Sequence, residues 1–359
     1  MGSGMSRPSV TALIDTYNHK RFVEEAIVSV IEQDFPLGEV EILVVDDGST
    51  DGTPEIVRKF EPRVRLIRKP NGGQASAFNA GLSQARGEII AFLDGDDWWA
   101  RNKLTRVAET LAADSNLGIV GHGIVVVRPE ANSESLTLRN GYTFQANTLE
   151  GADLFSARRA FLGTSRMTIR ARLLRAIGNV PETIRIEADE YLFTLAAILA
   201  RVQILPETLT YYRLHDANAY QIEQQDQGRM RRKQESIAAL AQELRDQLAR
   251  RGIAPNVARK LTRMVQAEAD QLRLILGDGW PWETAKTEWT LYRALHPGAS
   301  AAHRIFKTFS LVPAFALPPS FFYKLRAKLS VSSFYLGARK RLLPIPEHSH
   351  IERSSRVGS

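Results

Sequence analysis

Three carboxylates lie within four positions, immediately after the apolar run 89–93; they belong to Asp94, Asp96 and Asp97. Carboxylates this close repel one another unless a cation or a nucleotide binds among them. Gly95 allows a sharp turn, so that the side chains of Asp94 and Asp96 can converge on one ion. Hard oxygen ligands suit Mg²⁺ or Mn²⁺, which proteins often share with substrate phosphates. Taken alone, the segment could equally be a solvated acidic turn that caps the next helix.

The run 89–93 is too short for a helix and reads as a buried parallel strand. Further strands are expected at 10–16, 41–46 and 64–68, and helices at 22–33, 54–60 and 74–84. Strands that alternate with helices predict a mainly parallel, Rossmann-like α/β sheet flanked by helices. Right-handed crossovers place the carboxyl ends of such strands at one edge. We therefore expect the acids at 46–47, the glycine turn at 71–73 and the acids at 94–97 to share one crevice.

The rest of the chain changes character after about residue 224. Before it we expect a strand at 119–127, a polar, loop-like stretch at 128–147, a helix at 188–200 and strand-like segments at 202–214. After it, the stretches 224–251, 256–276 and 282–295 read as charged amphipathic helices. The sequence thus predicts an α-helical C-terminal region.

The composition is that of an ordinary globular protein, with 359 residues of which 44% are hydrophobic and 24% charged. This length suits one large domain and a smaller region. The chain has no cysteine, which excludes disulfides, zinc–thiolate sites and cysteine nucleophiles and suits a cytoplasmic protein. Residues 1–7 are interpreted as a disordered cloning remnant with no signal segment after them, and no run reaches the roughly 18–20 apolar residues of a membrane span.

The net charge of +7 is concentrated near the C-terminus. Nine Lys and Arg, but no Asp or Glu, lie between Trp289 and Pro346, so the remainder has a charge of 7 − 9 = −2. The segment 299–345 also carries many aromatic residues, and its prolines exclude one continuous helix. Two interpretations stay open: peripheral contact with the inner face of the plasma membrane, or packing on the catalytic domain or in a homo-oligomer. No nucleic-acid partner is expected, because no such motif accompanies the charge.

Four motifs in the N-terminal part resemble glycosyltransferase family 2, which comprises inverting enzymes of the GT-A fold that use nucleotide-sugar donors. They are LIDTYN at 13–18, VDDGSTDGT at 45–53, NGG at 71–73 with NAG at 79–81, and FLDGDD at 92–97. Their order and spacing make the resemblance specific. It implies a GT-A catalytic domain at 8–218, followed by a helical region at 219–298, the basic aromatic segment at 299–345 and a disordered tail at 346–359.

The resemblance also assigns roles to individual residues. It implies that the donor is bound by Asp15, Tyr17, Asp46, Asp47, Asn71, Asn79, Asp94, Asp96 and Arg213. It implies that Asp94, Asp96 and His215 hold Mn²⁺ or Mg²⁺, with Asp97 in support. Such a cation neutralises the diphosphate as it leaves. The alternative for His215 is an ordinary surface histidine, and Arg213 could pair with an acid instead of phosphate.

An inverting transfer needs a general base that takes a proton from the acceptor hydroxyl. The family usually has Glu-Asp at the position where this sequence has Asp189-Glu190, in reversed order. We expect Asp189 to be the base, with Glu190 as second choice and Glu187 as a third. The alternative is that acids in the first turn of a helix only complement its dipole.

The sequence as a whole predicts a metal-dependent, inverting hexosyltransferase, with a UDP-sugar favoured as donor and a saccharide or lipid-linked acceptor, in cell-envelope polysaccharide or glycoconjugate synthesis. The acceptor is expected among the loops at 128–172. One alternative is a sugar nucleotidyltransferase, which would carry a Gly-rich, cationic phosphate loop where this chain has TYNHK at 16–20. Another is an inactive domain kept for binding or assembly, although every motif acid is present.

Overall fold

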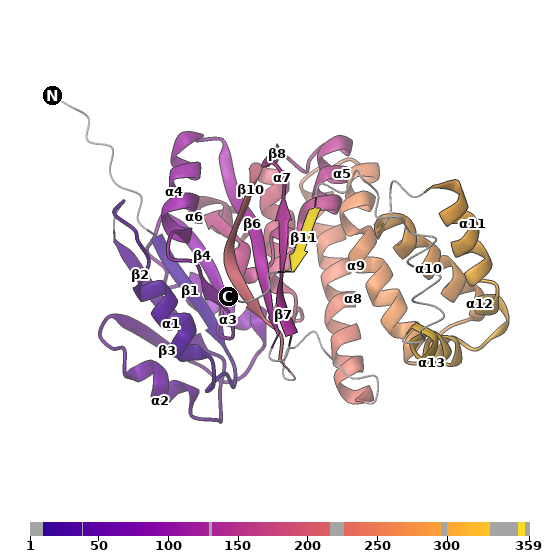
Figure 1. The fold of residues 1–359 in the computed structure, drawn as a ribbon, viewed down its shortest axis with the longest axis horizontal. Helices are drawn as coiled ribbons and strands as arrows, with labels where there is room; N and C mark the ends of the chain where they lie inside the picture. The colour runs from indigo at the N-terminus through magenta and orange to yellow at the C-terminus, as the bar shows by residue number, and fades with distance from the viewer. Residues whose placement is uncertain are drawn as a thin grey trace.

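The computed structural model describes residues 10–37, 39–128, 131–215, 226–295, 300–330 and 351–355. Its main sheet has the strand order β11-β7-β6-β9-β4-β1-β2-β3 (Figure 1). The N-terminal strands of this sheet are β1 (Val10–Thr16), β2 (Val40–Asp46), β3 (Val64–Arg68) and β4 (Ile89–Asp94). All three pairings among them, β1 with β2, β1 with β4 and β2 with β3, are parallel, as the sequence predicts.

Helices cover both faces of this parallel part. They are α1 (Val23–Ile31), α2 (Thr53–Arg58), α3 (Gln74–Leu82) and α4 (Lys103–Ala113). Neighbouring residues of β1 serve opposite faces: Leu13 belongs to the core that contains Phe78 of α3, and Ile14 to the core that contains Ile27 of α1 and Leu104 of α4. Because successive strand residues point to opposite faces, a strand buried on both sides is apolar throughout.

The second half of the sheet differs from the expectation of a polar loop at 128–147. It consists of β5 (Trp98–Trp99), β6 (Leu117–Arg128), β7 (Ala131–Leu138), β8 (Tyr142–Phe144), β9 (Thr168–Arg170) and β10 (Arg201–Arg213). Two strands, β7 and β8, occupy the stretch expected to be a loop, and they pair antiparallel with β6 and β10. Antiparallel strands can leave one face to water. The polar residues on that face made the stretch resemble a loop in the sequence.

Between β8 and β10 the chain forms α5 (Leu149–Arg158), the 3₁₀ turns η1 (Arg159–Phe161) and η2 (Thr164–Arg166), then β9, α6 (Ala171–Ile177) and α7 (Ala188–Leu199). Helix α7 is buried along almost its whole length, and Tyr191 and Leu195 belong to the larger core. This burial fixes the acids at the start of α7 relative to the sheet.

The helical region consists of α8 (Gln227–Arg250), α9 (Pro255–Ile275), α10 (Pro281–Leu295), α11 (Ala301–Ser310), α12 (Pro313–Ala316) and α13 (Pro319–Ser330), and lies on the right of Figure 1. Leu240 and Leu244 of α8 and Leu261 of α9 join the same core as α7. The short helices α11–α13 pack in a separate core with α10 and the end of α9. As expected, proline breaks this segment: Pro313 and Pro319 each begin a helix.

The tail differs from the expectation of disorder at one place, where β11 (Ile351–Ser355) pairs antiparallel with β7. Without β11, β7 would be an edge strand with unpaired backbone groups, and an extended segment can satisfy these whatever its side chains are. The expected boundaries at 218 and 298, residues 1–7 and most of the tail lie outside the described residues, as does 331–345 of the basic segment. Within the described part of the chain, no helix combines the length and the hydropathy needed to cross a membrane.

Candidate active site

The predicted acids meet at the carboxyl edge of the parallel strands. The register pairs Asp15 of β1 with Asp94 of β4, and Thr16 with Asp46 of β2. The tips of β1 and β4 are closely joined, because the Gly95 N–H donates to the Asp15 carbonyl at 2.8 Å. A Cβ on Gly95 would lie 2.6 Å from the Thr16 hydroxyl oxygen. The close approach of β1 therefore favours glycine between the two acids.

Negative charge is concentrated and poorly compensated in this crevice. Burial, and then repulsion from Asp96, Asp189 and Asp47, raise the pKa of Asp15. Burial, followed by repulsion from Asp15, does the same for the pKa of Asp94. The buried Oδ1 of Asp15 has no hydrogen-bond partner among the described residues. The crevice thus favours a bound cation.

Asp96 has the opposite character, because two histidines face it. Its Oδ2 forms a 3.0 Å hydrogen bond with His215 Nε2 and lies 3.7 Å from His19 Nε2. Burial alone would raise the pKa of Asp96, but the hydrogen bond with His215 and the charges of both histidines outweigh it, so that the pKa is lowered. His19, which the sequence analysis did not select, is held by the Thr16 hydroxyl (Nδ1 to Oγ1, 3.2 Å). The sequence did contain one indication of this role, because His19 follows β1 closely, within the TYNHK stretch at 16–20.

Arg213 supports the acidic loop from the end of β10. Its backbone N–H donates to Asp97 Oδ1 at 2.9 Å, and its Nε donates to the Asp96 carbonyl at 3.0 Å. Its guanidinium lies over the rings of Trp98, 4.4 Å from the centroid, and Phe22, and forms an ion pair with Glu25. Arg213 is thus brought to the predicted metal-binding acids, where it also holds their backbone.

Ser165 of η2 is a second residue that sequence reasoning missed. Its Oγ lies 2.6 Å from Asp97 Oδ2 and 3.3 Å from Asp94 Oδ2, and it accepts a hydrogen bond from the Asp94 N–H at 3.1 Å. Burial and the charge of Asp96 nevertheless raise the pKa of Asp97 to about 8. No local pattern around Ser165 indicates this role, which depends on a contact across 71 residues.

The acids at the start of α7 point in different directions. Asp189 accepts hydrogen bonds at Oδ2 from the Thr164 N–H (2.9 Å) and hydroxyl (3.0 Å), and its charge acts on Asp15 and Asp94. Glu190 instead pairs with Arg159 at 2.7 Å. Burial raises the pKa of Glu190 to about 7 against the opposing effect of Arg159. Of these two acids, Asp189 is the one whose charge acts on the acids of β1 and β4.

Glu187, the third candidate, is buried and precedes α7 in a left-handed conformation with φ of 62°. Non-glycine residues adopt this region rarely, and at a cost. The conformation marks the entry to α7 as a tightly specified piece of backbone.

The paired acids at the end of β2 organise a neighbouring turn. Asp47 accepts hydrogen bonds from the N–H groups of Gly72 (2.9 Å) and Gly73 (2.7 Å) and pairs with Lys69 (2.7 Å). Its carbonyl accepts from Asn71 Nδ2 at 3.0 Å. The carboxylate of Asp47 is thus used to shape the 69–73 turn.

Asp46 is fully buried, pairs with Arg68 (3.3 Å) and accepts from the Ser49 N–H (3.2 Å). An open hollow beside this pair is lined by Gly48, Arg68, Lys69 and Pro70. Tyr17 is 46% exposed at the end of β1.

Asn79 is not brought to this group. Its side chain amide donates to the Val180 carbonyl (2.8 Å) and accepts from the Val180 N–H (2.9 Å). These two bonds tie α3 to the segment that leads into α7, so Asn79 positions helices.

The donor chemistry of the crevice suits a divalent cation, since hard carboxylate oxygens with uncompensated charge converge there. Asp15 Oδ1, buried and without a hydrogen-bond partner, agrees with this. The arrangement is not a ready-made metal site, however: among the described residues, no three His, Asp or Glu side chains are grouped so that they could hold a metal ion. His215 and Asp96, two of the three predicted ligands, are hydrogen-bonded to each other.

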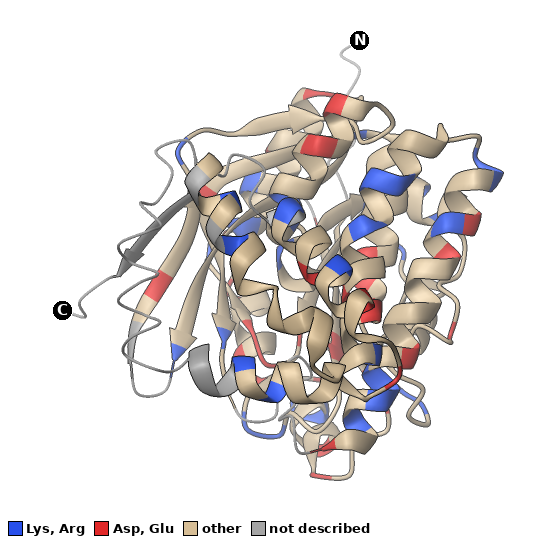
Figure 2. Ribbon diagram, turned by 90° about the vertical axis from the view of Figure 1, so that its right-hand side faces the viewer, with Lys and Arg blue, Asp and Glu red and all other residues tan. Residues whose placement is uncertain are grey.

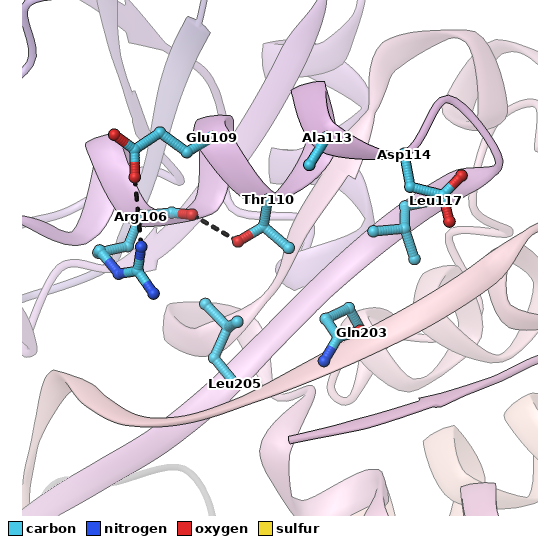
Figure 3. A pocket seen from close by; sticks show the side chains of 8 residues that line it. All are labelled: Arg106, Glu109, Thr110, Ala113, Asp114, Leu117, Gln203 and Leu205. Atoms are coloured by element: carbon cyan, nitrogen blue, oxygen red, sulfur yellow. Dashed lines mark hydrogen bonds and ion pairs between the residues drawn. The ribbon is translucent and has the colours of Figure 1, made fainter. Parts of the chain in front are cut away.

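A surface hollow of about 470 Å³ lies between α4 and the strands β6 and β10 (Figure 3). It is lined by Arg106, Glu109, Thr110, Ala113, Asp114, Leu117, Gln203 and Leu205. None of the predicted site residues lines it, and Arg106 is occupied by ion pairs with Glu109 and Glu207. The acidic crevice remains the candidate site.

Comparison with known proteins gives the same family as the motifs. Residues 11–171 match the family model described as glycosyl transferase family 2. An uncharacterised glycosyltransferase of Nostoc sp. is 28% identical over 292 residues, which are 76% of this chain and 89% of the relative. The poly(ribitol-phosphate) β-N-acetylglucosaminyltransferase TarS of Staphylococcus aureus is 28% identical over 215 residues, 56% of this chain but only 35% of TarS.

Solved structures show the same fold. A TarS structure with UDP-GlcNAc has a TM-score of 0.57 at 20% identity and covers 86% of this chain and 91% of that one. The mannosyltransferase PcManGT from Pyrobaculum calidifontis, in complex with GDP-Man and Mn²⁺, has a TM-score of 0.54 at 21% identity and covers 94% and 85%. The predicted GT-A fold is thereby confirmed.

Proposed function

Because this chain belongs to glycosyl transferase family 2, we propose that it transfers a hexosyl group from a UDP-sugar to a saccharide or lipid-linked acceptor with inversion at the anomeric carbon. The observation that carries the proposal is the meeting of Asp15, Asp94 and Asp96 with Asp189 in one crevice. A transferase needs both a site for the diphosphate and a base for the acceptor, and these acids lie close enough for their charges to act on one another.

The choice of a uridine donor is supported by the TarS relative, whose structure contains UDP-GlcNAc, whereas PcManGT contains GDP-Man. We assign the nucleoside to the hollow at Gly48 and Lys69, beside the 69–73 turn. Since Asp47 is already bonded to the glycines of this turn, its role there is to shape the turn. Tyr17, exposed at the end of β1, is available to contact the donor.

A divalent cation, Mn²⁺ or Mg²⁺, would be held by Asp96 with Asp94 and His215, and would supply positive charge to the departing diphosphate. The lowered pKa keeps Asp96 ionised at neutral pH. Arg213 holds the backbone of the Asp96–Asp97 turn, so that the carboxylates keep their direction.

Asp189 acts as the general base in this proposal, accepting the proton of the attacking acceptor hydroxyl. The two bonds from Thr164 fix Asp189 Oδ2, whereas Oδ1 accepts one hydrogen bond, from the Glu190 N–H at 2.8 Å, and has a second lone pair that can receive a proton. Glu190 is turned to Arg159 and is assigned no proton transfer. We place the acceptor near η1 and η2, because Thr164 and Ser165 connect this stretch to both Asp189 and Asp94.

The pathway is proposed from the relatives alone: TarS acts on poly(ribitol phosphate) by its name, which supports a role in cell-envelope polysaccharide or glycoconjugate synthesis in the cytoplasm. The family match favours a transferase over the nucleotidyltransferase alternative.

The first test is calorimetric titration of UDP, GDP and dTDP into the protein, each with and without Mn²⁺. Metal-dependent binding of UDP alone supports the proposal, whereas binding of GDP alone would indicate that the donor is a GDP-sugar. Absence of binding to all three would favour the inactive domain. Release of pyrophosphate from a sugar 1-phosphate and a nucleoside triphosphate would instead indicate a nucleotidyltransferase.

A further inference from the structure

The C-terminal helices α11–α13 turn an apolar surface toward solvent. Ile305, Phe309 and Val312 are 57%, 72% and 58% exposed, and Phe315 and Phe321 are 63% and 53% exposed. Residues 305, 309 and 312 follow one another at helical spacings of four and three, so they share one side of α11 and of the turn after it. Several aromatic side chains of this segment therefore remain exposed and do not pack on the rest of the chain.

The opposite side of the same helices is firmly attached. Leu311, Ala314 and Phe322 are buried in a core with Leu274 and Ala285. The attachment fixes which side of the three helices remains outside, so the exposed apolar residues belong to a packed structure.

A buried acid on α10 reinforces this orientation. Glu288 is 1% exposed, accepts from Gln271 Nε2 at 2.8 Å and pairs with Lys307 of α11 (3.2 Å) and Arg326 of α13. Two cations of the basic segment are therefore paired with a buried acid, while Ile305 and Phe309 point outward. This is the reverse of an ordinary amphipathic helix on a water-facing surface.

The charged residues of the segment that carries the apolar surface, residues 300–330, are all basic. Residues 300–330 contain no Asp or Glu, and Figure 2, which faces these helices, shows their ribbon with basic positions and no acidic ones. Arg304 and Lys324 are exposed on α11 and α13. Basic residues beside exposed aromatics are the combination that binds anionic lipid, because the cations attract the headgroups while the aromatics insert below them.

We propose that α11–α13 dock this protein on the surface of an anionic lipid bilayer, with Phe309 and Phe315 inserted at the boundary between headgroups and acyl chains. A second copy of the chain fits this surface less well. A two-fold dimer through the same surface would bring Arg304 and Lys324 toward a second copy of residues 300–330, a stretch that contains no Asp or Glu. The proposal is independent of the transferase chemistry.

The experiment is vesicle flotation of the full chain with two kinds of liposome, phosphatidylcholine alone and phosphatidylcholine with phosphatidylglycerol. The wild-type protein is expected to float with the anionic vesicles and at least about tenfold less with the neutral ones. The double variant F309S/F315S should lose at least about tenfold of its anionic partition, because it removes the two aromatic side chains that insert into the bilayer. The matched control is L149S/L199S, which removes two side chains that are 44% and 39% exposed outside α11–α13 and should float like wild type.

Thermal melting of each variant checks that it is folded, and light scattering measures its mass. Equal flotation of wild type and F309S/F315S would overturn the proposal. So would a dimer that F309S/F315S abolishes while the wild-type protein fails to float, since the surface would then be a contact between copies.

Discussion

Oδ2 of Asp189 accepts two hydrogen bonds from the same residue, Thr164: one from the backbone N–H at 2.9 Å and one from the hydroxyl at 3.0 Å. Gln74 Nε2 donates to that hydroxyl at 3.1 Å, and the Ala188 N–H donates to Gln74 Oε1 at 2.9 Å. Helix α3, η2 and the start of α7 are thus joined in one network. The side chain proposed as the base is held by residues from three separate elements, which limits the positions it can take.

Asp189→Asn is expected to lower kcat by about 10²–10⁴-fold, the usual contribution of a general base. The amide keeps the size of the side chain but cannot take the proton. UDP affinity, measured by calorimetry, should stay close to that of wild type.

The control for this variant is Glu190→Gln, whose side chain faces Arg159 and not the crevice. It should retain transfer activity. A Glu190→Gln enzyme as impaired as Asp189→Asn would reassign the base.

Asp96→Asn is expected to remove the effect of Mn²⁺ on UDP binding, because a neutral amide is a weaker ligand for a hard cation than a carboxylate. Calorimetric titration with and without Mn²⁺ measures this. Asp153→Asn, on the exposed side of α5, is the matched control and should keep the metal effect. An undiminished Mn²⁺ effect in Asp96→Asn would remove Asp96 from the metal site.

Two glycines with nearly the same backbone conformation provide a test of the 69–73 turn, to which we assign the nucleoside. Gly73 has φ of 86° and Gly178 φ of 84°, but a Cβ on Gly73 would lie 2.6 Å from the Arg185 carbonyl, whereas a Cβ on Gly178 would meet nothing within 4 Å. Gly178→Ala should cost only the strain of a positive φ in extended backbone, about 1–3 kcal/mol of the free energy of unfolding.

Gly73→Ala adds a backbone clash beside Asp47 and should cost more than Gly178→Ala, with weaker UDP binding as well. Denaturant unfolding and UDP titration of both variants measure the two effects. Equal losses in the two variants would show that the 69–73 turn yields easily.

The raised pKa of Glu190 predicts a dependence of stability on pH. Burial raises this pKa from 4.5 to about 7, so between these values the folded chain binds a proton that the unfolded chain releases. By linkage, this carboxyl reduces the free energy of unfolding progressively as the pH rises from about 4.5 to about 7. The reduction is at most about 3 kcal/mol, at 1.36 kcal/mol per pKa unit.

Glu190→Gln removes this titration. Its free energy of unfolding should therefore fall less than that of wild type between pH 5 and pH 8, as urea unfolding at the two pH values would measure. Parallel losses in both proteins would mean that the Arg159 ion pair compensates the charge in the folded state.

The sequence by itself determined the parallel half of the sheet and the family. The apolar runs that end at Asp46 and Asp94 are local patterns, and the burial of both faces follows from them. The acids that follow each run must lie at one edge once the crossovers are right-handed. For this reason the position of Asp46 and Asp94 at one edge of the sheet was predictable without any knowledge of side-chain packing.

Only the tertiary structure decided how the residues of the site divide their roles. Asp189 and Glu190 are adjacent, but successive helix residues point about 100° apart, so packing of α7 turns one to the crevice and the other to Arg159. Ser165 and His19 contact Asp94 and Asp96, whereas Asn79 is hydrogen-bonded to Val180, away from the acids. These contacts join residues that no local sequence pattern links. Strand β11 likewise finds β7 from far along the chain. Such contacts depend on the whole packed arrangement, because residues distant in sequence become neighbours only when the elements between them are placed.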